Sequence, residues 1–157
     1  MSTPSSRADS RPLAKTSSAF SPSASARQAT ARQYSPTILL VDDDDAVREG
    51  LRRVLQTEGW KVISAASGEE ALEYLLNHQP DLMITDLSMA QVSGWDLLFH
   101  ENLQRPNLPV FVVTALALPA AGGADKFADE FFQKPLDFDV LLDAVRRCLG
   151  ARRKNLE

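Results

Sequence analysis

The sequence contains a single cysteine, Cys148, and lacks any long apolar run. One cysteine excludes intrachain disulfide bonds and clusters of cysteine metal ligands. No stretch approaches the roughly 20 apolar residues of a membrane-spanning helix, and the N-terminus lacks the continuous apolar stretch of a secretory signal. The length of 157 residues is enough for one globular domain and hardly enough for two, which argues against a multidomain enzyme. We therefore expect a soluble cytoplasmic protein without a membrane span.

The formal net charge of −4 is unevenly distributed along the chain. Residues 1–35 carry a net charge of +4 and residues 151–157 carry +2, whereas residues 36–150 have 9 basic and 19 acidic side chains. Such an acidic body repels nucleic acid phosphates, so we expect no direct DNA binding by it. The N-terminal segment is rich in Ser, Ala and Arg and lacks apolar periodicity. The sequence thus predicts a disordered basic tail (1–35), one globular domain (36–150) and a basic C-terminal tail (151–157).

Five short runs rich in β-branched residues, leucine or phenylalanine recur within the acidic body. Such runs, bounded by polar residues, are typical of strands that are buried on both faces. The predicted strands are residues 37–42, 61–65, 81–85, 108–114 and 130–134. Segments with helical character separate the strands, so the sequence predicts an open, five-stranded parallel α/β sheet with right-handed crossovers.

Capping residues mark the ends of the predicted helices. Asp45 is the candidate N-cap of the first helix, and Gly59 has the position of the residue that follows its C-cap. Ser67 and Glu70 have the capping-box spacing at the start of the second helix. Asp137 can cap the last helix.

Two further helical segments are expected between the third and fifth strands. One covers residues 94–102, where apolar side chains supply one helical face. The other, over residues 115–128, is the least helix-like, because Pro119, Gly122 and Gly123 each weaken a helix interior. We therefore expect the fourth helix to be short or irregular.

Polar residues stand where the predicted strands end. Asp42 and Asp43 close the first strand, Asp86 the third, Thr114 the fourth and Lys134 the fifth. In an open parallel sheet, ligands bind beyond the carboxyl ends of the strands, at the point where the strand order reverses. If the order is 2-1-3-4-5, the first and third strands are neighbours and the three carboxylates converge at this crevice.

Three clustered carboxylates raise one another's pKa values and need a compensating cation. Oxygen-only ligation with open positions for water and phosphate suits Mg²⁺ better than a soft metal. Lys134 and the Thr114 hydroxyl add groups that can neutralise and orient a phosphoryl group. The residues therefore favour phosphoryl transfer to one of the aspartates. The alternative for residues 42–45 is a solvated acidic turn that only caps a helix.

Several segments together resemble a known family. In order and at family-like spacing, the chain contains "ILLVDDDDAVREGLRRVL", "ASGEEALEYL", "PDLMITDLSM...SGWDLL", "LPVFVVTALA" and "FFQKPLDFDVLLDAV". This ensemble is similar to the receiver domain of two-component response regulators. The resemblance covers about residues 37–150 and implies the flavodoxin-like fold with strand order 2-1-3-4-5.

The resemblance implies roles for the acidic residues. Asp86 would be the phosphoacceptor, which attacks the phosphohistidine of a partner histidine kinase or phosphotransfer protein. Asp43, Asp86 and the backbone carbonyl of Ser88 would bind Mg²⁺ directly, and Asp42 would act mainly through water. The metal offsets charge on the transferring phosphoryl group, so the reaction depends on positioning more than on acid–base chemistry.

The resemblance also implies roles at the ends of the last two strands. Lys134 would pair with one phosphoryl oxygen, and Thr114 would donate its hydroxyl to another. The movement of Thr114 vacates space, and Phe131 has the position of the family's aromatic switch residue. Phe131 is more securely explained as a packing residue than as a switch, because a buried aromatic side chain needs no further role. The Lys134–Pro135 peptide is often cis in this family.

The sequence departs from the family pattern near the predicted site. Ala90 stands where a proline is usual, and Ser93 replaces an acidic residue. Lys134 follows Thr114 at a shorter spacing than the resemblance implies, and Phe127 replaces a glycine. These changes affect a loop and the fourth helix, on a face that receivers commonly use for signalling and dimerisation. They remove none of the predicted site groups.

These features predict a single-domain response regulator that accepts a phosphoryl group on Asp86. It would catalyse only its own phosphorylation and dephosphorylation, and would signal through contacts with an unknown downstream protein. One alternative is a receiver-like interaction scaffold that does not use phosphorylation. Another is a haloacid-dehalogenase-like phosphatase, with Asp42 as nucleophile and Asp44 as acid/base, although the domain is short for that family and Asp86 would have no role.

Overall fold

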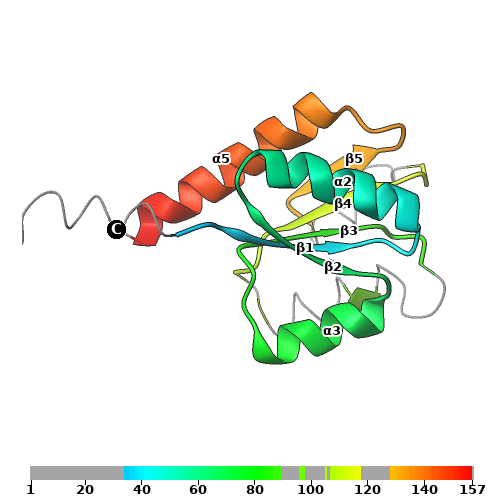
Figure 1. The fold of residues 1–157 in the computed structure, drawn as a ribbon, viewed down its shortest axis with the longest axis horizontal. Helices are drawn as coiled ribbons and strands as arrows, with labels where there is room; N and C mark the ends of the chain where they lie inside the picture. Colours follow the sequence, from blue (N-terminus) through cyan, green and yellow to red (C-terminus); the bar gives the residue numbers. More distant parts are fainter. Residues whose placement is uncertain (1–33, 90–95, 98–104, 106, 118–127, 157) are drawn as a thin grey trace, which may run out of the picture. The chain divides into compact units, whose positions relative to one another are not determined.

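A five-stranded parallel sheet lies at the centre of the fold (Figure 1). The computed structural model describes residues 34–89, 96–97, 105, 107–117 and 128–156. The strands are β1 (Thr37–Val41), β2 (Lys61–Ala65), β3 (Leu82–Thr85), β4 (Val110–Thr114) and β5 (Glu130–Gln133). Their order is β2-β1-β3-β4-β5, and all four neighbouring pairs are parallel. The predicted sheet and its strand order are confirmed.

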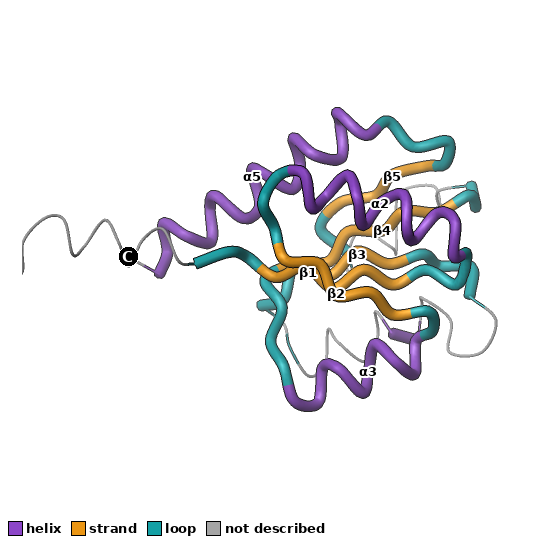
Figure 2. Tube along the Cα trace, in the orientation of Figure 1, coloured by secondary structure: helices purple, strands orange, loops and turns teal. Residues whose placement is uncertain are grey.

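The longer helices of the described residues lie against the two faces of this sheet. They are α2 (Asp45–Thr57), α3 (Gly68–Asn77) and α5 (Phe138–Leu156). The ribbon and the tube both show α2 and α5 on one face and α3 on the other (Figure 1, Figure 2). Of the helix predicted over residues 94–102, only residues 96–97 are described, and both are helical. Most of the predicted irregular segment 115–128 and of the predicted tail 1–35 lies outside the described residues.

Both faces of the sheet are buried, which explains the continuous apolar sequences of its inner strands. Successive side chains of a strand point to opposite faces. Ile38 and Leu40 of β1 accordingly belong to the core beneath α2 and α5, whereas Leu39 and Val41 belong to the core beneath α3. The polar residues that follow these strands are thereby held on a rigid, close-packed support.

The first helix begins one residue earlier in the acidic run than the sequence predicts. Asp44 is the N-cap of α2, and its Oδ1 accepts hydrogen bonds from the backbone N–H groups of Ala46 and Val47 at 2.9 and 3.0 Å. The assignment of this role to Asp45 is wrong, since Asp45 is the first helical residue. Each of the four consecutive aspartates has suitable chemistry for a cap. The turn in which the Asp44 N–H bonds to Asp42 Oδ1, at 2.9 Å, selects Asp44.

The other predicted capping residues are confirmed. Gly59 follows the C-cap of α2 with a φ of 82°, a conformation that glycine adopts without strain. The Ser67 hydroxyl accepts a hydrogen bond from the backbone N–H of Glu70 at 3.1 Å, and the Glu70 carboxylate accepts one from the backbone N–H of Ala66 at 2.8 Å, one residue before the N–H that a capping box uses. Asp137 Oδ1 accepts hydrogen bonds from the backbone N–H groups two and three residues later, at 3.0 and 3.2 Å.

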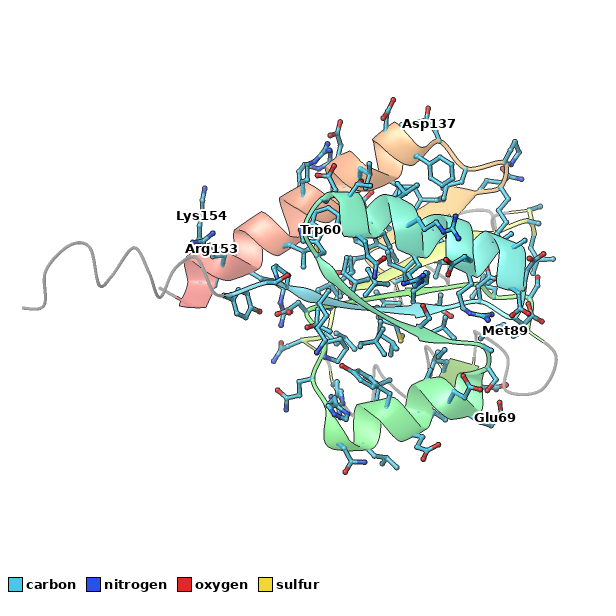
Figure 3. All side chains as sticks on the ribbon, in the orientation of Figure 1. Trp60, Glu69, Met89, Asp137, Arg153 and Lys154 are labelled. Atoms are coloured by element: carbon cyan, nitrogen blue, oxygen red, sulfur yellow. The ribbon has the colours of Figure 1, made fainter. Side chains whose placement is uncertain are left out.

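The last helix, α5, continues through residues 151–156. The sequence-based division of the chain places these residues in the C-terminal tail. Arg153 and Lys154 project from its end, far along the helix from Asp137 (Figure 3). Cations in the last turn of a helix interact favourably with the helix dipole, which favours this extension. No helix among the described residues is both long enough and apolar enough to cross a membrane.

The single thiol should react slowly in the folded protein. Cys148 is partly buried on α5, and burial raises the pKa of its thiol to about 11. Because the thiolate is the reactive form, alkylation should be slow at pH 8. Its rate should rise about tenfold for each unit by which the pH increases, until the pH reaches the pKa. Iodoacetamide labelling followed by intact mass measures the rate, with urea-unfolded protein as the fast control. Equal rates in the folded and unfolded protein would contradict this expectation.

Candidate functional site

The carboxyl ends of three strands bring one lysine and two aspartates together. Asp42 directly follows β1, Asp86 follows β3 and Lys134 follows β5. The register pairs Val41 with Thr85, so the two aspartates leave adjacent strands at the same level. Lys134 Nζ lies 3.0 Å from Asp42 Oδ2 and 2.8 Å from Asp86 Oδ2. The ammonium group therefore bridges two carboxylates that are distant in the sequence.

Each of these carboxylates uses one oxygen for the ammonium and the other for its own loop. Asp42 Oδ1 accepts a hydrogen bond from the backbone N–H of Asp44, and Asp86 Oδ1 accepts one from the backbone N–H of Ser88, both at 2.9 Å. This repeated turn orients both Oδ2 atoms toward Lys134. Each carboxylate is thus oriented by one backbone N–H group and by Lys134.

Burial makes the charges at this site interdependent. Asp42 is 2% exposed and Asp86 is 6% exposed, and an unpaired buried carboxylate is costly. Burial raises the pKa of Asp42 above its ordinary value, although the Asp44 backbone N–H and the Lys134 ammonium both act against this rise. Burial by itself would lower the pKa of Lys134, but hydrogen bonds to Asp86 and Asp42 outweigh it and raise that pKa. The lysine is the compensating cation of the site.

Thr114 lies at the same edge, at the end of β4. It is fully buried, and its Oγ1 accepts a hydrogen bond from the backbone N–H of Leu116 at 3.2 Å. Its main-chain oxygen accepts a hydrogen bond from the backbone N–H of Lys134 at 2.9 Å. The backbone at Thr114 is thereby joined directly to the residue that bridges the two aspartates.

The predicted metal ligands are only partly brought together. Asp42 and Asp86 share one cation, whereas Asp43 is exposed. Within the part of the chain that the structure describes, no three His, Cys, Asp or Glu side chains form a group that could hold a metal ion. The converging donors are nevertheless all carboxylate oxygens around a single positive charge, which is the donor chemistry that Mg²⁺ prefers. The residues present therefore fit a hard divalent cation, with Asp43 beside them in the sequence.

One contact of this edge is missing from the sequence-based list of site residues. Arg48, on α2, donates a hydrogen bond from Nη1 to the main-chain oxygen of Asp42 at 2.7 Å, and its Nη2 pairs with the Asp45 carboxylate. The signal in the sequence is a basic residue placed one helical turn after four aspartates. An arginine at that spacing also fits an ordinary helical ion pair, so the pattern alone does not single it out.

The sequence model of the response regulator receiver domain family matches residues 38–146. This chain belongs to that family. The match covers β2 to β5, all of β1 except its first residue, and each of the predicted site residues.

Individual relatives agree with this assignment. The response regulator MprA of Mycobacterium ulcerans is 38% identical over 125 residues, which are 78% of this chain and 53% of the relative. The chain thus spans about half the length of the curated relatives it matches.

Solved structures give the same picture. TrrA of Thermotoga maritima, solved in complex with Mg²⁺-BeF, is 31% identical with a TM-score of 0.68, over 72% of this chain and 98% of that one. A CheY-like receiver protein of Methanospirillum hungatei is 27% identical with a TM-score of 0.72, over 78% of this chain and 99% of that one.

The receiver assignment bears on the alternatives. Receivers are signalling domains rather than metabolic enzymes, and a receiver gives Asp86 a role that the dehalogenase-like phosphatase does not. Asp44, the acid/base of that alternative, has its carboxylate engaged in capping α2. The phosphatase reading is therefore the weakest of the three.

Pro135 and Phe131, which lie close to Lys134 in the sequence, also bear on the resemblance. The Lys134–Pro135 peptide is cis, as the resemblance leads us to expect. Phe131 of β5 is partly buried and packs against the core beneath α3. This contact supports its packing role, and its role as a switch stays a prediction.

Proposed function

We propose that Asp86 accepts a phosphoryl group from the phosphohistidine of a histidine kinase or phosphotransfer protein, in a Mg²⁺-dependent reaction. The observation that carries this proposal is the Lys134 ammonium held between the two buried carboxylates of Asp42 and Asp86. Buried carboxylates are held together at a cost in free energy that an apolar core would avoid, which favours a chemical role for them.

In this reaction, an Asp86 carboxylate oxygen attacks phosphorus, and the bond between phosphorus and the imidazole nitrogen breaks. The electron pair of that bond stays with the imidazole, and an acyl phosphate forms on Asp86. Lys134 already contacts Asp86, and it would neutralise a phosphoryl oxygen as negative charge arrives. The Thr114 hydroxyl, one strand away, would donate a hydrogen bond to another oxygen.

The cation site would be formed by Asp42, Asp43, Asp86 and the main-chain oxygen of Ser88. When bound, Mg²⁺ offsets negative charge on the phosphoryl group. TrrA, a similar receiver, was solved with Mg²⁺-BeF, which supports this part of the proposal.

The phosphorylated receiver would signal through contacts with another protein, with Thr114 and Phe131 as the responsive residues. A cytoplasmic location stays a prediction, as does the absence of direct DNA binding by the domain.

Incubation with acetyl phosphate and Mg²⁺ tests the proposed function. Intact mass should increase by one phosphoryl group in the wild type, and omission of Mg²⁺ should abolish the increase. Asp86→Asn should lower the yield at least about a hundredfold, because it removes the nucleophile. Asp143→Asn, which changes an exposed aspartate of α5, is the matched control and should behave as the wild type.

The same experiment separates the alternatives. A wild type that gains no phosphoryl group from acetyl phosphate or from a kinase contradicts the proposal and favours the scaffold. Multiple-turnover phosphatase activity that survives Asp86→Asn and is lost in Asp42→Asn would favour the dehalogenase-like enzyme.

A further inference from the structure

Arg48 contacts both ends of the acidic run 42–45, which forms the loop between β1 and α2 and the first residue of α2. Its Nη1 donates to the main-chain oxygen of Asp42 at 2.7 Å, and its Nη2 pairs with the carboxylate of Asp45. One planar guanidinium therefore spans the loop that carries two of the proposed cation ligands. Lysine cannot reproduce this geometry, because a planar fork that reaches two acceptors at once is particular to arginine.

The contact with Asp42 is made to the main chain, and this determines what it controls. The carbonyl oxygen of Asp42 belongs to the peptide whose nitrogen is that of Asp43. A peptide unit is planar, so a fixed carbonyl oxygen fixes the orientation of the backbone from which the Asp43 side chain departs. The Asp42 side chain is held separately, by the Asp44 N–H at 2.9 Å and by Lys134 at 3.0 Å.

The two partners of Arg48, the Asp42 carbonyl and the Asp45 carboxylate, differ in how strongly they hold its guanidinium. The Arg48 side chain is 17% exposed, whereas Asp45 is almost fully exposed. Exposed ion pairs three residues apart on a helix contribute little. A hydrogen bond from a charged, largely buried donor to a carbonyl is stronger than such an exposed ion pair. The contact with the Asp42 carbonyl is therefore the one with the larger structural consequence.

We infer that Arg48 is a positioning residue for the cation site, which orients the Asp42–Asp43 peptide so that the Asp43 carboxylate can reach a cation held by Asp42 and Asp86. The inference rests on the proposed function in one respect, since it takes Asp43 as a ligand. It adds a residue outside the ligand set whose effect is on affinity for the cation. Groups that hold metal ligands in place commonly change metal affinity when they are removed.

Calorimetric titration with Mg²⁺ tests the inference. Arg48→Met keeps an unbranched side chain and removes both donors, so the dissociation constant should rise about tenfold. Arg48→Lys retains the charge and can serve one acceptor at a time, so its value should lie between those of the wild type and Arg48→Met. Arg53→Met is the matched control: it removes an exposed arginine of the same helix that pairs with Glu49, and it should bind Mg²⁺ as the wild type does.

Kinetics with acetyl phosphate distinguish positioning from a general structural effect. In Arg48→Met the Mg²⁺ concentration for half-maximal phosphorylation should rise by the same factor, and the rate at saturating Mg²⁺ should stay within about twofold of the wild type. An unchanged dissociation constant overturns the inference, as does an equal change in Arg53→Met or a lower saturating rate with unchanged affinity. If Arg48→Met fails to fold, an unchanged dissociation constant in Arg48→Lys overturns it. A wild type that binds Mg²⁺ but gains no phosphoryl group contradicts the proposed function alone and leaves the affinity comparison to decide.

Discussion

Replacement of Lys134 with methionine should lower the free energy of unfolding at pH 7 by about 2 kcal/mol, because it leaves two buried carboxylates without their cation. Removal of one partner of a buried ion pair commonly lowers the free energy of unfolding by more than this. We expect a smaller loss here because the Lys134 side chain retains some exposure to water. Phosphorylation of Asp86 should also be lost or strongly slowed, since the same ammonium group contacts its Oδ2. Urea unfolding and the acetyl phosphate assay measure the two effects.

The loss of stability in Lys134→Met should depend on pH. Burial raises the pKa of Asp42, and in the wild type Lys134 acts against this rise, so the variant should have a still higher pKa. A group with a raised pKa in the folded state stabilises the fold below its unfolded pKa, here 3.8, and this contribution disappears as the pH rises through the folded pKa. The variant should therefore approach the wild type in acid and fall furthest behind near neutrality.

Two further variants control this prediction. Lys61→Met removes an exposed lysine from β2 and should leave stability nearly unchanged. Addition of Asp42→Asn to Lys134→Met removes one of the stranded charges and should recover part of the stability at pH 7. A loss of stability that is the same at acid and neutral pH would contradict the electrostatic explanation.

Replacement of Phe111 with alanine should destabilise the fold by about 3–5 kcal/mol, which is the usual range for a phenylalanine removed from a core. Phe111 is 1% exposed in β4, which is paired on both sides, by β3 and by β5. Its ring centroid lies 5.6 Å from that of Phe132, and the two planes are tilted by 48°. Tilted aromatic pairs stabilise a fold by more than the apolar area that they bury. The variant should therefore lose the contact between the two rings as well as the burial of Phe111.

Urea unfolding of Phe111→Ala measures this loss. Leu76→Ala is the matched control, because this leucine of α3 is 77% exposed and its truncation should cost less than about 0.5 kcal/mol. Similar losses in the two variants would show that the core beneath α2 and α5 does not support the sheet as described.

The sequence determined the parallel sheet and the edge at which the site lies, and the family resemblance implied the strand order. Apolar runs and their polar ends are local features, and each strand needs only its own residues to be recognised. Asp42, Asp86, Thr114 and Lys134 each stand directly at or after a strand end. Because parallel strands share one carboxyl edge, their approximate meeting point follows from that placement.

The choice of cap and the role of Arg48 depended on tertiary structure. Four consecutive aspartates offer the same cap chemistry, and only the turn at Asp42 selects Asp44. The contact between Arg48 and a main-chain oxygen has no signature in the side-chain pattern, because every residue carries a carbonyl.

The charge balance of the site is likewise a property of the fold. The sequence predicts three carboxylates that need a cation, and the structure places Lys134 between two of them and leaves Asp43 exposed. Lys134 is 92 residues from Asp42 and 48 from Asp86 along the chain. Contacts over such separations depend on how strands and loops are packed, which local periodicity does not encode. The sequence therefore placed these groups at one edge of the sheet, and the tertiary structure decided which of them meet and pair, because burial and distance set the strength of each charge interaction.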